Sequence, residues 1–139
     1  MRLALQPIVE QLVAAGCRNV AGVMEFSAQT VEPRAKPAHF VVPIAEQPQP
    51  NTLAGARDQK IDVRWSVMVV LDGARRHVAG ISEDVKVETS RVADALTGWT
   101  HPEASRPTDY DGGRLASADG STVVWEVRFR STWHLRKAS

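Results

Sequence analysis

The hydrophobic and polar residues at the C-terminal end of the chain alternate with a period of two. Between residues 126 and 136 the even positions carry charged or polar side chains, whereas apolar side chains occupy the odd positions, interrupted only by Ser131. The apolar set consists of Val123, Trp125, Val127, Phe129, Trp133 and Leu135. This pattern predicts a long strand over residues 122–135 that lays one face on a core and exposes the other.

The same alternation recurs in residues 59–71. One face of this second strand carries Ile61, Val63, Trp65, Val67, Val69 and Leu71. The other face begins polar and ends apolar, with Met68 and Val70. A strand that is apolar on both faces over its second half is expected to be covered on both sides, which predicts a central place in the sheet.

Weaker alternation predicts further strands over residues 19–26, 38–44 and 115–118. The second of these ends at Pro43. Because proline lacks the amide hydrogen that a central strand needs, we expect this strand at or near an edge of the sheet. Asp119-Gly120 is a typical two-residue hairpin turn and predicts that residues 115–118 pair with the C-terminal strand.

Helical spacing appears in two places. Ile8, Val9, Leu12 and Val13 predict an amphipathic helix over residues 2–15, ended by Gly16 in a left-handed C-terminal cap. Ser82 is the expected N-cap of a second helix over residues 82–97, with Gly98 at its end.

Two polar segments separate these elements. Residues 45–59 carry Pro48, Pro50, Asn51 and Gly55 and almost no apolar side chain. They predict a long loop, which in a compact domain is either functional or disordered. Residues 75–80 begin with Arg75 and Arg76 and predict a short basic loop.

The elements therefore follow the order α-β-β-β-α-β-β. This order predicts an α+β fold, in which two main helices pack on a mostly antiparallel (mixed) sheet of about four to five strands. With 139 residues, the chain (1–139) is expected to form a single domain with a core that requires no disulfide or metal.

Composition narrows the functional classes. Seventeen basic and sixteen acidic residues give a net charge of +1, so no global field concentrates nucleic acid. The single cysteine, Cys17, is expected to be a small buried residue. No apolar run is long enough for a membrane helix, and Pro7 and Glu10 interrupt the N-terminus where a secretion signal needs a continuous apolar segment. We therefore expect a soluble protein that stays in the cytoplasm after synthesis.

No catalytic constellation is apparent. The four histidines lie on different predicted elements without metal-ligand spacing, and no serine lies in a nucleophile-elbow setting. The glycines at 112, 113 and 120 lie beside a hairpin, where a phosphate-binding loop is not expected. We therefore expect no enzyme activity, no metal and no cofactor.

The polar faces of the two strongest strands carry four arginines. If these strands are neighbours, Arg64, Arg128, Arg130 and Arg136 form a basic stripe. The alternative is a solvated face in which Glu126 and Asp62 balance the arginines, because charge pairs across strands are ordinary. We favour the alternative.

Several motifs together resemble those of one protein family. They are A-D-A-L-T-G-W-T-H-P over residues 93–102, Y-D-G-G-R-L over residues 110–115, and P-A-H-F-V-V-P over residues 37–43. With the long strand that follows, they resemble the tail terminator (tail completion) proteins of long-tailed bacteriophages. Thr100 and His101 separate Trp99 from Pro102, where a tighter G-W-x-P is expected.

The resemblance implies a structural protein of the virion, located at the head-proximal end of the tail and assembled in the bacterial host cytoplasm. Members of this family form a hexameric ring that caps the finished tail tube and stops its polymerisation. The ring presents a surface to the head-side connector protein, and DNA passes through it. The implied partners are therefore further copies of the chain, the tail tube protein and the connector, with DNA only in transit and no membrane.

For such a ring we expect two sets of site residues. The contacts with neighbouring subunits or the tube are assigned to Gln47, Pro48, Pro50, Asn51, Arg57, Arg75 and Arg76. The lumen of the ring is assigned to Arg64, Arg128 and Arg130. The alternative function is a head-completion adaptor, or another small phage binding module, that acts as a monomer.

Overall fold

The two segments with the strictest alternation form the two longest strands, β3 (Ala56–Asp72) and β5 (Thr122–Ala138), which pair antiparallel along their whole length. The computed structural model describes residues 1–22, 36–73, 78–119 and 121–138. The other elements of these described residues are α1 (Gln6–Ala14), β1 (Val20–Gly22), β2 (Ala38–Pro48), α3 (Val78–Leu96) and β4 (Asp109–Ala118). Their order confirms the predicted α+β class.

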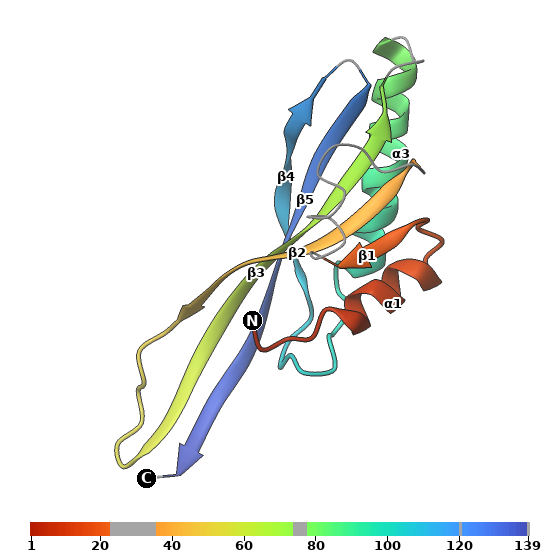
Figure 1. Ribbon diagram of the computed structural model, residues 1–139. Coiled ribbons are helices and arrows are strands. Elements are labelled where there is room, and N and C mark those ends of the chain that lie inside the picture. The colour runs from red at the N-terminus through yellow and green to blue at the C-terminus, as the bar shows by residue number, and fades with distance from the viewer. Residues whose placement is uncertain (23–35, 74–77, 120, 139) are drawn as a thin grey trace.

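The strands form one mixed five-stranded sheet in the order β1-β2-β3-β5-β4 (Figure 1). Only β1 and β2 are parallel; the other neighbours are antiparallel. β3 lies at the centre, as predicted. Both helices pack on one face of this sheet, where they cover the apolar sides of β3 and β5.

The main core lies between the helices and the odd-numbered residues of β3 and β5. Ile8 and Leu12 of α1 and Val92 and Leu96 of α3 are fully buried there. The Trp65 and Phe129 rings stack with centroids 4.9 Å apart. Ser131, the interruption in the apolar pattern of β5, accepts a hydrogen bond of 3.0 Å from the Trp65 indole, so the polar residue satisfies a buried donor.

A smaller apolar cluster lies on the opposite face. It consists of Ala38, Phe40 and Val70, with Met68 and Val124 partly buried beside it. The second half of β3 is thus buried on both sides, which confirms the prediction from its alternation.

At the other end of the sheet, β2, β3 and β5 continue beyond the helices (Figure 1). We call this projection, residues 45–60 and 134–138, the arm. Ile61 and Trp133 are still buried at its base, but every residue of the arm is at least partly exposed. The sheet therefore has a helix-covered body and a bare, solvated arm.

The arm corrects the predicted loop over residues 45–59. β2 runs on to Pro48 and β3 begins at Ala56, so only residues 49–55 connect the strands. Pro43 does not end β2, because the register shifts between Pro43 and Ala45 and pairing with β3 resumes. His39 N–H points away from β3 and donates to Asn19 O, on the side of β1. Because backbone N–H groups of a strand alternate between its two sides, the Pro43 nitrogen lies on the same side as that of His39. The missing N–H of Pro43 therefore removes no hydrogen bond to β3.

The predicted position of β2 at or near an edge of the sheet is confirmed, since β1 is the one described strand beyond it. Within the described residues, β1 pairs only with His39, Phe40 and Val41. The predicted residues 23–26 of the first strand lie outside the described part of the chain.

Both helices begin elsewhere than predicted, although both end as predicted. α1 starts at Gln6, with Pro7 in its first turn, rather than at residue 2. α3 starts at Val78, which places Ser82 inside the helix rather than at its N-cap. Residues 78–80 of the predicted basic loop are therefore helical, and residues 75–77 lie outside the described part of the chain. Gly16 (φ +91°) and Gly98 (φ +82°) follow the two helices in the left-handed region.

β4 begins at Asp109, earlier than the predicted residue 115, because two bulges let the glycine-rich motif join the sheet. Gly112 (φ +99°) lies in the first bulge, a conformation that glycine adopts at little cost. The predicted hairpin is confirmed: Ala118 pairs with Val123, and Asp119 N–H donates to Thr122 O at 3.0 Å.

Gly113 allows the Trp125 ring to lie directly against β4. A Cβ atom at this position would be 2.8 Å from Trp125 Nε1 and 3.2 Å from the Glu126 carbonyl oxygen. Gly113→Ala is therefore expected to lower the free energy of unfolding by about 1–3 kcal/mol, measured by urea titration. Ser117→Ala, at an exposed position of the same strand, is the control and should change it by less than about 0.5 kcal/mol. An unchanged midpoint for the glycine variant would contradict this packing.

Candidate functional site

The tip of the arm is an ordered turn held by one side chain. Asn51 Oδ1 accepts the Asp58 N–H at 2.8 Å, while Asn51 Nδ2 donates to the carbonyl oxygens of Leu53 at 2.9 Å and Ala56 at 3.0 Å. The Asn51 amide therefore substitutes for backbone pairing across the turn. The arm ends in a defined surface on which Leu53 is 50% exposed.

Asn51→Ala is expected to loosen this tip. Loss of three hydrogen bonds at a partly exposed site should lower the free energy of local opening by about 1–2 kcal/mol, equivalent to roughly tenfold faster trypsin cleavage after Arg57. Thr52→Ala, at the neighbouring exposed position, should leave the cleavage rate unchanged. Equal rates for the two variants would show that the amide does not hold the turn.

The structure brings most of the expected contact residues together on the arm. Gln47 and Pro48 end β2, Pro50 and Asn51 lie in the connection, and Arg57 lies near the start of β3. All but Asn51 are exposed. Arg75 and Arg76, the other two expected contact residues, lie outside the described residues.

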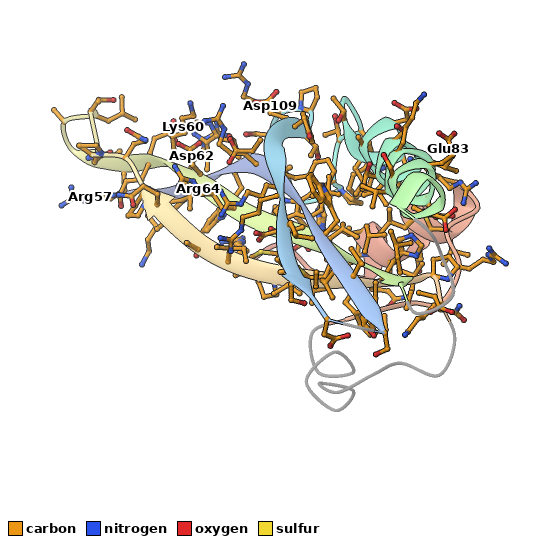
Figure 2. The ribbon with its side chains drawn as sticks, turned by 90° about the horizontal axis from the view of Figure 1, so that it is seen from above. Arg57, Lys60, Asp62, Arg64, Glu83 and Asp109 are labelled. Atoms are coloured by element: carbon orange, nitrogen blue, oxygen red, sulfur yellow. The ribbon has the colours of Figure 1, made fainter. Side chains whose placement is uncertain are left out.

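The expected lumen residues also lie side by side, on the face of the sheet opposite the helices. Arg64 pairs directly with Arg130 across β3 and β5, and Arg128 is opposite Ser66. All three arginines are exposed. The strands are neighbours, so the basic stripe exists. Figure 2 shows Asp62 and Arg64 between Arg57, which lies toward the end of the arm, and Asp109.

Acidic groups balance part of this stripe. Glu126 Oε1 accepts from Arg114 Nε at 2.6 Å and from Arg128 Nε at 3.3 Å, and Asp109 lies 3.6 Å from Arg130. Arg64 forms no ion pair with any residue that the structure describes. A small pocket of about 100 Å³ opens beside it, lined by Ile44, Arg64, Trp65, Ser66, Asp111, Arg128 and Phe129.

Glu126 is not the solvated counter-charge that the alternation predicts, because its side chain is buried and only 2% exposed. Besides the two arginines, its Oε2 accepts the Ser66 hydroxyl at 2.7 Å. Burial alone would raise the pKa of this carboxyl group, but the hydrogen bonds from Arg114 and Ser66 and the charge of Arg128 outweigh burial and lower the pKa. The face therefore has a buried anion beneath its exposed arginines.

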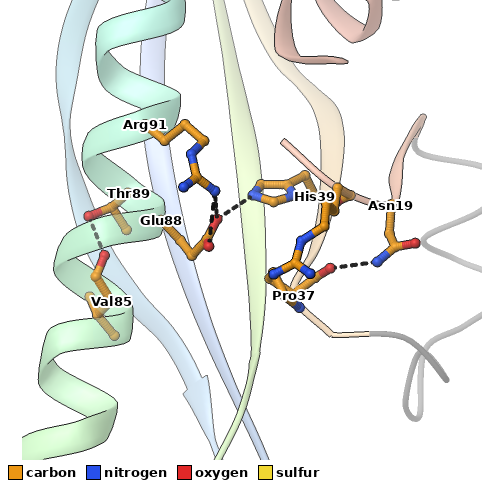
Figure 3. A network of polar contacts seen from close by, with 8 residues as sticks. Asn19, Pro37, His39, Val85, Glu88, Thr89 and Arg91 are labelled. Carbon is orange, nitrogen blue, oxygen red and sulfur yellow. Dashed lines mark hydrogen bonds and ion pairs between the residues drawn. The ribbon is translucent and has the colours of Figure 1, made fainter. Parts of the chain in front are cut away.

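A second polar network joins α3 to β2 (Figure 3). His39 is fully buried; its Nδ1 donates to Arg18 O at 2.7 Å, and its Nε2 lies 3.5 Å from Glu88 Oε2. Glu88 also pairs with Arg91 at 3.1 Å. Burial lowers the pKa of His39, even though the Arg18 carbonyl and Glu88 act in the opposite direction. No pattern in the sequence pointed to this network.

His101 explains the unexpected spacing between Trp99 and Pro102. Its Nε2 donates to Ala4 O at 2.7 Å, and its Nδ1 accepts the Glu103 N–H at 3.0 Å. The fully buried ring thereby ties the connection after α3 to the N-terminal segment. The one extra residue thus makes room for this structural contact.

Among the residues that the structure describes, no group of three His, Cys, Asp or Glu side chains is arranged to hold a metal ion. No helix in the described part of the chain has the length and apolar character needed to cross a membrane. The surface made by the arm and the arginine-bearing face is the candidate site, because it gathers the expected contact and lumen residues that the structure describes.

The chain is similar to two kinds of known protein. The family model described as phage tail terminator protein matches residues 1–139. A chain of the solved structure "Virion of native gene transfer agent (GTA) particle" has a similar fold, with a TM-score of 0.56 at 15% identity over 96% of each chain. At this identity the second match concerns the fold alone. No curated protein matches the chain.

Proposed function

Because the chain belongs to the phage tail terminator family, we propose that six copies form a ring that caps the tail tube, ends its polymerisation and presents the joining surface for the head-side connector. The family makes the chain a structural component of a phage virion and suggests a role without catalysis. The proposal that the chain forms a capping ring rests on the family match over the whole chain, together with the solvent-exposed arm.

A tube grows because each ring offers the next a matching surface. A terminator must therefore match the tube on one side and fail to match it on the other. The fold suits such a role because its two ends differ: the body is covered by helices, and the arm exposes strands on both faces. A molecule with two unlike ends can bind the tube without offering the same surface again.

The arm supplies contacts with neighbouring subunits or the tube in this proposal, through Gln47, Pro48, Pro50, Asn51 and Arg57. Arg75 and Arg76 are assigned to the same role. Support comes from the exposure of the arm residues and from the hydrogen bonds of Asn51, which give the tip a fixed shape before binding. Preorganisation of this kind lowers the entropic cost of association.

The lumen is lined by Arg64, Arg128 and Arg130 in this proposal. Glu126 and Asp109 offset two of these charges, so the face is only mildly positive. Such a face tolerates a passing DNA backbone without the strong binding that many uncompensated cations produce. A ring structure in which these side chains lie on the outer wall would overturn this assignment.

Negative-stain images of the purified protein mixed with tail tubes test the function. We expect a cap at one end of each tube and no further growth. A protein that stays monomeric and decorates capsid portals alone would instead be a head-completion adaptor or another small phage binding module.

A shortened arm tests the site within the same experiment. Gln49 N–H donates to Lys60 O at 2.8 Å, so replacing residues 50–59 by Asn-Gly joins a paired position with a two-residue hairpin turn. The variant should fold but fail to cap tubes. Normal capping by this variant would remove the arm tip from the proposed contacts and leave the proposed function standing.

A further inference from the structure

The arm carries two exposed cations, Arg57 and Lys137, and an exposed leucine, Leu53. Arg57 and Lys137 are directly opposite each other on β3 and β5, and both are exposed. The side chain of neither residue forms an ion pair or hydrogen bond with any described residue, whereas the Asp58 carboxylate of the arm is already engaged by His134 and Arg136. Like charges directly opposite destabilise a sheet, so this pair costs free energy in the isolated chain.

The exposed side of α3 carries the complementary features. Glu83, Val87, Ser90 and Asp94 recur at the i, i+4, i+7 and i+11 positions, which places them on one line along the helix, and all four are exposed. We call this line the α3 stripe. Val87 is 43% exposed at its middle. The carboxylate of neither Glu83 nor Asp94 has a hydrogen-bond or ion-pair partner in the described part of the chain.

The arm and the α3 stripe lie at opposite ends of the molecule. Figure 2 shows Arg57 at one end and Glu83 at the other, so an arm does not reach the stripe of its own chain. A contact between them must therefore join two copies through unlike surfaces. A contact of this type is heterologous and generates a ring when its rotation closes.

We propose that the arm of one copy docks on the α3 stripe of the next copy. Leu53 packs against Val87, and Arg57 and Lys137 approach the carboxylates of Glu83 and Asp94. A second copy is the partner because the same chain carries both the basic, apolar arm and the acidic, apolar stripe. Lys86, the exposed base beside the stripe, does not cancel the two acids. The inference rests on the proposed ring and names the contact that builds it.

Charge reversal tests the contact with full-length protein. The first variant is Arg57→Glu with Lys137→Glu, and the second is Glu83→Lys with Asp94→Lys. Each variant alone places like charges at every contact, so its dissociation constant for ring assembly should rise at least about tenfold. An equimolar mixture should assemble again, because copies that alternate around an even-numbered ring meet opposite charges at every contact. The chain with all four substitutions should also assemble alone.

Assembly is measured by light scattering and by negative-stain images, with and without tail tubes. Arg106→Glu, an exposed reversal in the connection after α3, is the control and should assemble like the wild type. If the wild type forms rings but either reversed variant does so equally well, or the mixture is no better than its components, the arm does not dock on the stripe and the proposed ring stands. If the wild type forms no ring under any of these conditions, the proposed function falls, and this contact with it.

Discussion

Glu126→Ala is expected to lower the free energy of unfolding by about 3 kcal/mol, because the variant leaves several polar groups without their anion. The fully buried Ser66 hydroxyl loses its acceptor, and the guanidinium groups of Arg114 and Arg128 lose the carboxylate that they share. Both arginines are partly exposed and can turn to water, which keeps the loss at the lower end of the range for a buried ion pair. Thermal and urea unfolding at pH 7 measure the change.

Asp109→Ala is the matched control, since it removes an exposed carboxylate 3.6 Å from Arg130 on the same face. An exposed pair of this kind contributes less than about 1 kcal/mol. The difference between the two variants should also depend on pH. The folded-state pKa of Glu126 is lowered, so its contribution is present above the unfolded value of 4.5 and is lost as the pH falls through the folded-state pKa. Equal stability of the two variants at pH 7 would contradict a structural role for the buried carboxylate.

Alternation predicted the long strands because burial imposes it. Successive residues of β3 and β5 face alternately the helices and the opposite side of the sheet. Because the helix-covered side is buried, apolar residues recur at every second position of the sequence. Glu126 lies on the side that its even position predicts. Its burial was not predictable, because it depends on Arg114, which β4 brings into place only through its two bulges.

The arm was predicted as a loop for the same physical reason. Strands β2 and β3 are solvated on both faces there, so residues 45–48 and 56–60 carry no alternation of apolar and polar side chains. Pairing with the neighbouring strand holds them extended, and a single sequence does not display that pairing. The polar composition still identified the segment as a candidate contact surface. Its shape, and the proximity of Arg57 to Lys137, required the fold.

Ser82 was wrongly predicted as the start of α3, because a serine followed by two acidic residues satisfies the local rule for an N-cap. Local rules do not exclude a helix that begins earlier, and the helix continues back to Val78. The helix ends predicted from Gly16 and Gly98 are confirmed, because a residue in the left-handed conformation ends a helix regardless of its tertiary contacts.

The stability of the protein is expected to fall as the pH drops below 6.5, because of His39. Burial holds the folded-state pKa of this histidine below its unfolded value of 6.5. Between these two pKa values the unfolded chain binds a proton that the folded chain does not. The free energy of unfolding therefore decreases with falling pH, by at most about 1.4 kcal/mol per pH unit for one proton. The carboxyl groups of Asp58, Asp119 and Glu126 also have lowered pKa values, but their contributions to stability are lost only at lower pH, where these groups are protonated.

His39→Asn separates this effect from the other histidines. The asparagine amide retains a donor for the Arg18 carbonyl oxygen in place of Nδ1–H. The smaller side chain fills the buried site less well, and the variant should therefore be less stable than the wild type at pH 7. Because an amide does not titrate, the variant should lose less stability than the wild type between pH 7 and pH 5. Urea titrations at several pH values measure both slopes. A wild-type stability that rises as the pH falls below 6.5 would mean that the ion pair between Nε2 and Glu88, at 3.5 Å, outweighs the burial of the charge. Since Arg91 already neutralises Glu88 on its other side, we expect burial to dominate.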